Sequence, residues 1–214
     1  MRRNNRIRLM GLFLAAVLLV SSGCTGEKES QQSTKSPLNG DLVCLEYDRY
    51  TGYVGGKWVS NVAAMLVMNQ SGEFLEYATV QCDLGPRRGT FRIEGLPPGR
   101  MCWVLEQDLA SISEGERFVA MACDEYYFNP NALMETDDLS VSIQGSTMSV
   151  TNRSGKRLTN VAVYFKNLYG DGVFFSGDAY MVTFPSLEPG DTASKQHAYL
   201  GDSSQVVKFS FQEG

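Results

Sequence analysis

Two landmarks occur twice in this sequence, and they occur in the same order each time. The first is a strand-like segment that begins at Asn61 in one copy and at Asn160 in the other, each followed by Val-Ala. The second is a turn ending in Pro-Gly, at Gly99 and again at Gly190. A repeated order of landmarks predicts one domain present twice. We therefore expect Asn61 to be equivalent to Asn160, and Gly99 to Gly190.

Short runs of Val, Ile, Thr, Tyr and Phe, broken by Gly, Pro, Asn and Asp, predict β-strands in both copies. The expected fold is all-β, with two tandem immunoglobulin-like β-sandwich domains. In the clearest strand, alternation places Val161, Val163 and Phe165 toward the core and Lys166 toward solvent.

The strand that starts near Val62 in the first copy is apolar on both faces. We expect Val62 and Ala64 to face the core, so that Met65 and Val67 point outward. An outward apolar pair needs a cover. The cover is either the preceding Gly-rich loop or the neighbouring domain.

The N-terminus has the pattern of an export signal: four Arg residues, an apolar run over residues 9–20, and small residues up to Cys24. The apolar run is too short to span a membrane comfortably. Ser21-Ser22-Gly23-Cys24 resembles the bacterial lipoprotein signal, although that signal usually has Leu or Val where this chain has Ser21. The resemblance implies that Cys24 is acylated, becomes the first mature residue, and anchors the chain to the extracytoplasmic face of the cell membrane.

A polar segment with no apolar residue follows Cys24 and predicts a disordered tether. The expected organisation is a signal peptide over residues 1–23, a tether over 24–36, a first immunoglobulin-like domain over 37–128, a linker over 129–138 and a second immunoglobulin-like domain over 139–214.

Charge excludes one class of partner. The formal net charge of the full chain is −5, and removal of the signal peptide, with its four Arg and no acidic residue, makes it −9. An acidic protein is unsuited to nucleic acid, whose affinity for proteins depends on Lys and Arg contacts to phosphate. We expect the membrane to be contacted through the lipid alone.

The second copy resembles a known family on the segments 148–155, 158–161, 168–172 (Leu-Tyr-Gly-Asp-Gly) and 187–190 (Leu-Glu-Pro-Gly). These are similar to the FxLYD-type immunoglobulin-like domain of bacterial secreted lipoproteins. The resemblance covers roughly residues 147–211 and, more weakly, 42–123. It implies a small β-sandwich without catalytic residues, and it supports the fold far better than a function.

Four further cysteines lie in the first copy: Cys44, Cys82, Cys102 and Cys123. Outside the cytoplasm four cysteines suggest disulfides, with three possible pairings. The alternative is that they are small buried apolar residues. No pair has the Cys-x-x-Cys spacing of a metal site, and we expect neither a metal nor a cofactor.

The sequence gives little support to catalysis. Its one histidine, His197, has no nucleophile motif beside it, so we expect a surface histidine and no enzyme. The candidate ligand or partner contacts are aromatic: Tyr50, Tyr53, Trp58, Tyr126 and Tyr127. Exposed aromatic rings suit a glycan or a protein partner. The alternative is that Trp58 and the tyrosines near it merely cover Met65 and Val67.

These features predict a cell-surface lipoprotein that acts as a non-catalytic binding or assembly module at the bacterial envelope. Its partner is an unidentified protein or glycan. The competing interpretation is an accessory subunit or enzyme of the envelope that acts on glycan or peptide. A cluster of titratable groups in a deep pocket would favour that competitor.

Overall fold

The computed structural model describes residues 36–38, 41–85, 87–113, 119–170 and 172–214, which belong to one compact unit, Ser33–Gly214. They form thirteen β-strands, and no helix occurs among them, which confirms the all-β class. The signal segment with Cys24, and nearly all of the tether, lie outside the described residues. The strands are β1 (Ser36–Pro37), β2 (Leu42–Val54), β3 (Lys57–Asn69), β4 (Phe74–Asp83), β5 (Arg88–Leu96), β6 (Met101–Leu105), β7 (Val119–Asn129), β8 (Leu139–Gln144), β9 (Thr147–Asn152), β10 (Leu158–Tyr169), β11 (Val173–Leu187), β12 (Thr192–Gln196) and β13 (Ser204–Glu213).

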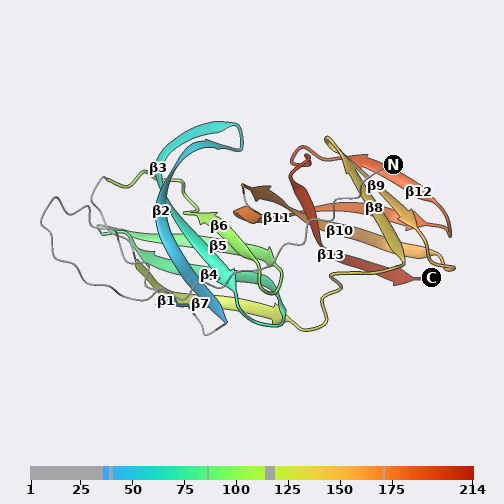
Figure 1. Ribbon diagram of the computed structural model, residues 1–214, viewed down its shortest axis with the longest axis horizontal. Coiled ribbons are helices and arrows are strands. Elements are labelled where there is room, and N and C mark those ends of the chain that lie inside the picture. Colours follow the sequence, from blue (N-terminus) through green and yellow to red (C-terminus); the bar gives the residue numbers. More distant parts are fainter. Residues whose placement is uncertain (1–35, 39–40, 86, 114–118, 171) are drawn as a thin grey trace, which may run out of the picture. The chain divides into compact units, whose positions relative to one another are not determined.

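The strands form three sheets (Figure 1). One has seven strands in the order β1-β2-β3-β6-β11-β10-β13, and the other two have three strands each, β5-β4-β7 and β12-β9-β8. We call β1–β7 the N-terminal half and β8–β13 the C-terminal half. The seven-stranded sheet contains strands from both halves, because β6 pairs in parallel with β11, with Phe174 opposite Cys102 and Phe175 opposite Trp103.

Each half buries its core between two sheets. In the N-terminal half, Met65 and Val104 of the large sheet share a buried cluster with Val80 and Phe91 of the β5-β4-β7 sheet. In the C-terminal half a separate cluster joins β8 and β9 to β10 and β11. Apolar side chains on facing sheets are what alternating strands provide when one face of each sheet is buried.

The same hydrogen-bonded corner closes both halves. Asn69 ends β3 and Asn152 ends β9, and both side chains are buried. Each side-chain amide nitrogen donates to two backbone carbonyls at 2.8–2.9 Å. One carbonyl belongs to the residue four positions later in the chain, and the other belongs to the residue that ends the strand before the Pro-Gly turn. Each Asn carbonyl accepts the backbone N–H of the turn glycine, Gly99 or Gly190, at 2.8–2.9 Å.

This corner confirms the equivalence of Gly99 and Gly190 but shows that the pairing of Asn61 with Asn160 is wrong. If Asn69 matches Asn152, then β3 matches β9 and β4 matches β10. Asn61 lies on β3 and Asn160 on β10, so they occupy different strands. They share a local conformation, with φ of 55° and 52°, and that explains their similar sequence context.

Strand β10 has the predicted alternation, but not the predicted exposure. Val161, Val163 and Phe165 are fully buried, as expected. Lys166 points to the opposite face, but it is fully buried too, so the expectation of a solvated lysine is wrong. The reason is that the N-terminal half covers this face: Tyr164, which shares it, packs against that half's core.

Strand β3 is also covered on both faces, and its predicted orientation is reversed. Met65 and Val67 lie in the main core, while Val62 and Ala64 lie in a smaller cluster on the other face. That smaller cluster is covered by side chains from both halves, among them Tyr50 and Phe175. Tyr53 and Trp58 do not belong to it.

A long hairpin replaces the loop expected before Trp58. Strands β2 and β3 continue past the core to a turn at Gly55-Gly56, and they bend at their far end (Figure 1). Both glycines have positive φ (56° and 80°), which a two-residue hairpin turn of this hand requires. We call residues 50–60 the hairpin arm.

Candidate functional site

The five predicted contact residues lie in three separate places, and four of them form two pairs. Tyr53 and Trp58 pair across the hairpin arm with ring centroids 5.0 Å apart, and 68% and 57% of their surfaces are exposed. Tyr126 and Tyr127 lie on β7, where Tyr127 packs beside Tyr77 of β4 with ring centroids 6.5 Å apart. Strands β2 and β7 belong to different sheets, so the sequence prediction merged two surfaces.

Tyr50 belongs to a third feature, a cleft on the face of the large sheet where the smaller apolar cluster lies. The cleft has a volume of about 250 Å³. We call it the aromatic cleft, and it is lined by Asp48, Arg49, Tyr50, Thr51, Ala64, Trp103, Tyr169 and Phe175.

The parallel pairing of β6 with β11 creates this cleft. It places Phe175 beside Trp103, although they are far apart in sequence. The Phe175 ring then lies 5.0 Å from that of Tyr50 and 5.1 Å from that of Tyr169. The result is a row of contacting aromatic rings contributed by both halves. Burial, followed by the neighbouring Tyr169, raises the pKa of the Tyr50 phenol, which therefore stays neutral at physiological pH.

The cleft joins ring faces to a polar border. Asp48, Arg49 and Thr51 lie on the same strand as Tyr50 and supply charged and hydroxyl groups beside the rings. Such a surface binds ligands that have both an apolar face and hydrogen-bonding groups. Sequence reasoning missed Trp103, Tyr169 and Phe175, because each belongs to an ordinary-looking strand and only the contact between the halves brings them together.

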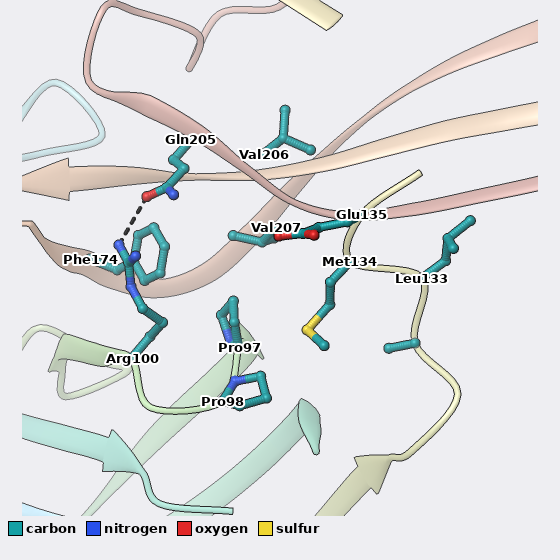
Figure 2. A pocket seen from close by; sticks show the side chains of 11 residues that line it. Pro97, Pro98, Arg100, Leu133, Met134, Glu135, Phe174, Gln205, Val206 and Val207 are labelled. Carbon is teal, nitrogen blue, oxygen red and sulfur yellow. Dashed lines mark hydrogen bonds between the residues drawn. The ribbon is translucent and has the colours of Figure 1, made fainter. Parts of the chain in front are cut away.

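A larger pocket lies at the junction of the halves (Figure 2). It has a volume of about 530 Å³ and we call it the junction pocket. Its walls are the turn after β5, the segment between β7 and β8, and the start of β13. The lining residues are Pro97, Pro98, Arg100, Ala132, Leu133, Met134, Glu135, Phe174, Gln205, Val206 and Val207.

The pocket and the cleft lie on opposite faces of the large sheet. Successive side chains of a strand point to opposite faces. Phe174 lines the junction pocket, while its neighbour Phe175 lines the aromatic cleft. The two concavities are therefore separate sites that share strand β11.

Lys166 is held by four backbone carbonyls. Its Nζ lies within hydrogen-bond distance of the oxygens of Glu94 (2.8 Å), Ser176 (3.4 Å), Gly177 (3.1 Å) and Asp178 (2.8 Å), and its three N–H groups are shared among these four acceptors. The N-terminal half contributes one acceptor and the C-terminal half three. Burial lowers the pKa of this ammonium from its ordinary value. The acceptors are main-chain groups at a bulge in the strand, so the lysine acts as a structural clamp. We call the lysine together with its four carbonyls the carbonyl cage.

The four cysteines are free in the structure, so the possible disulfides are not formed there. Cys44, Cys82 and Cys102 are fully buried, and Cys123 is half-buried. Burial raises the pKa of the Cys82 thiol to about 12, and that of the Cys44 and Cys123 thiols to about 11. Thiols with raised pKa values are poor nucleophiles.

His197 lies among aromatic rings. Its ring is edge-on to Phe165 with centroids 5.3 Å apart, and its Nδ1 accepts the backbone N–H of Tyr199 at 3.3 Å. A base that activates a nucleophile needs a hydroxyl or thiol within hydrogen-bond reach. The contacts of His197 are instead those of a packed ring at the edge of the C-terminal core.

No group of three His, Cys, Asp or Glu side chains among the described residues is placed to hold a metal ion. Within the same residues, no helix is long and apolar enough to cross a membrane.

Comparison with models of known protein families found no match for this sequence. A search of curated proteins likewise found no significant similarity.

Proposed function

We propose that this chain is a lipid-anchored, extracytoplasmic binding module of the bacterial envelope, without catalytic activity, and that the aromatic cleft is its binding surface. The observation that carries the proposal is the row of contacting rings formed by Tyr50, Phe175 and Tyr169, beside Trp103 and a charged border. Aromatic residues and Arg dominate the energetics of recognition surfaces.

The tandem immunoglobulin-like organisation, with domains of the FxLYD type, belongs to the same proposal. It is supported by the corner at Asn69 and its copy at Asn152, which close two sandwiches with the same hydrogen bonds. A binding module made of sandwiches presents its ligand site on sheet faces, hairpins and loops. The aromatic cleft and the hairpin arm fit this arrangement.

Photocrosslinking in intact cells tests the cleft. Tyr169, which is 55% exposed, is replaced by p-benzoylphenylalanine in the full chain, with Ser142 of β8 and Tyr127 of β7 replaced in parallel as controls. We expect one dominant adduct at Tyr169, identified by mass spectrometry as glycan or protein, and none at Ser142. An adduct at Tyr127 alone, or equal labelling at all three positions, would contradict a binding site in the cleft.

The anchor is tested separately by mass spectrometry of the native N-terminal peptide. We expect Cys24 to be the first residue and to carry a diacylglycerol, because two acyl chains hold a protein at a membrane durably and one does not. Substitution Cys24→Ala should abolish acylation. An unmodified Cys24, or a mature N-terminus elsewhere, would end the lipoprotein proposal and leave the cleft proposal unaffected.

A further inference from the structure

We propose that the junction pocket is a second binding site, independent of the aromatic cleft, for a small monocarboxylic acid with a compact apolar body. The pocket's volume of about 530 Å³ falls within the roughly 300–1,000 Å³ typical of small-molecule sites, which occur preferentially at junctions like this one. Its shape, its apolar walls and one cation specify the ligand.

The walls are held by hydrogen bonds, so the pocket exists before a ligand arrives. The turn that carries Pro97 and Pro98 is fixed at both ends, since the Asn69 side chain binds the Leu96 carbonyl and Gly99 donates to the Asn69 carbonyl. On the other side, the Leu133 carbonyl accepts the Phe209 N–H at 2.7 Å. A preformed pocket binds more tightly because little has to be ordered on binding.

The interior is mainly apolar and leaves apolar surface at its rim. Leu133 and Met134 are 38% and 36% exposed, and Met134 faces the two prolines across the cavity (Figure 2). Burial of such surface is the main favourable contribution to binding an apolar body. The ligand's body therefore lies between the prolines and Met134.

The charged end of the pocket is Arg100. Figure 2 shows it with Gln205 and Phe174 at one end, away from Leu133. Its guanidinium lies 4.8 Å from the Phe174 ring centroid, and Nη2 donates to the Gln205 side-chain oxygen at 2.9 Å and to the Gly172 carbonyl at 3.2 Å. Both bonds use Nη2, and among the described residues Nη1 and Nε of Arg100 have no hydrogen-bond acceptor, so their donors can bind a carboxylate.

Glu135 limits the charge of the ligand. It is the acidic residue among those lining the pocket, so one cation and one anion face the cavity. A monocarboxylate is fully paired by Arg100, whereas the second charge of a phosphate monoester would have no cationic partner among the lining residues and would face Glu135. This balance favours a carboxylic acid over a phosphate.

The test uses fluorine NMR on the full chain in lipid nanodiscs, with 4-(4-fluorophenyl)butyrate and its neutral amide as probes. We expect the acid to bind roughly tenfold or more tightly than the amide, because a hydrogen bond to a charged group is worth about that much. Arg100→Gln should remove the difference. Arg153→Gln deletes the same charge at an exposed position outside the pocket, and should leave the difference intact.

A second pair of variants separates binding from folding. Met134→Glu places another carboxylate at the exposed rim and should weaken binding of the acid more than binding of the amide. Gln144→Glu on β8 adds the same charge elsewhere and should change neither affinity. Partitioning into lipid differs between the acid and the amide, so it is measured for each probe with empty nanodiscs and subtracted. Equal affinities of the wild type for the acid and the amide would overturn the proposal. So would an equal loss of the acid–amide difference in Arg100→Gln and Arg153→Gln. The same holds if Met134→Glu and Gln144→Glu change the affinities alike.

Discussion

Lys166 shows how a charged side chain is accommodated in an interior without a carboxylate partner. Its four acceptors are backbone carbonyls, and burial alone would strongly disfavour the ammonium. An acceptor set drawn from two segments of chain stabilises the charge and at the same time fixes those segments. The lysine's role is thus conformational.

Lys166→Met should lower the free energy of unfolding by about 2–4 kcal/mol, because it leaves several buried carbonyls without their donor. Urea denaturation followed by circular dichroism measures this. Lys195→Met is the matched control, since Lys195 is exposed and donates to one carbonyl, that of Thr183. A Lys166→Met protein as stable as the control would show that the cage contributes nothing.

The buried thiols should lower the free energy of unfolding at alkaline pH. Burial raises the pKa of Cys82 to about 12 from its ordinary 9.0, and neighbouring Cys44 and Asp83 act in the same direction. Above pH 9 the unfolded chain releases this proton while the folded chain keeps it, so the free energy of unfolding falls as the pH rises. Lys166, with its lowered pKa, contributes the opposite slope below its ordinary pKa of 10.5.

Urea midpoints measured between about pH 8 and pH 11 check the sign. The wild-type midpoint should fall above about pH 9, because four thiols with raised pKa values act there against the one lysine whose pKa is lowered. Cys82→Ala should begin lower, because packing is lost, and should then fall less steeply. Parallel slopes for the two proteins would contradict a raised thiol pKa.

At the scale of elements, the sequence predicts one face of each strand well and the other poorly. Period-two alternation identified the Val161, Val163 and Phe165 face, because a core residue is apolar whatever covers it. It failed for Lys166 and for the orientation of Met65, because the cover of the second face comes from segments far away in the sequence. The aromatic cleft was missed for the same reason, since Phe175 lies beside Trp103 only because β6 pairs with β11.

The repeated corner gives a prediction for strand ends. Asn69→Ala and Asn152→Ala should each cost about 2–3 kcal/mol, because each removes an amide that binds two carbonyls and accepts from a serine, Ser71 or Ser154. Similar losses for the two variants, measured by urea denaturation, would support their equivalence. Asn131→Ala at the exposed turn after β7 is the control and should cost little. Losses that differ greatly between the two corners would argue against a common role.

At the scale of the whole described unit, the halves share more than one strand pairing. Lys208 of β13 forms an ion pair with Glu76 of β4 at 2.5 Å, and its ammonium lies 4.3 Å from the Tyr164 ring centroid. Phe174 and Val207 belong to the core of the N-terminal half. Interactions of this kind couple the two halves into one cooperative unit.

Gly177→Val tests that coupling. A Cβ at Gly177 would collide with the carbonyl of Arg92 in the N-terminal half, so strand β11 could not approach. We expect the wild type to unfold in one calorimetric transition and Gly177→Val to unfold in two, as each half melts by itself. Gly155→Ala, where nothing lies within 4 Å of the added carbon, should keep a single transition. Two transitions in the wild type would contradict the coupling.

The shared core has a consequence for biosynthesis. A chain made from its N-terminus normally folds its first domain while the rest is still being synthesised, at roughly 5–20 residues per second. Here Val104 and Val207 lie in the same cluster, so synthesis of the first precedes that of the second by roughly 5–20 s at such rates. The N-terminal half stays incomplete until the last strand, close to Gly214, has emerged. A truncation that removes β13 would therefore damage both halves, including the N-terminal half, whose own strands β1–β7 would all be present.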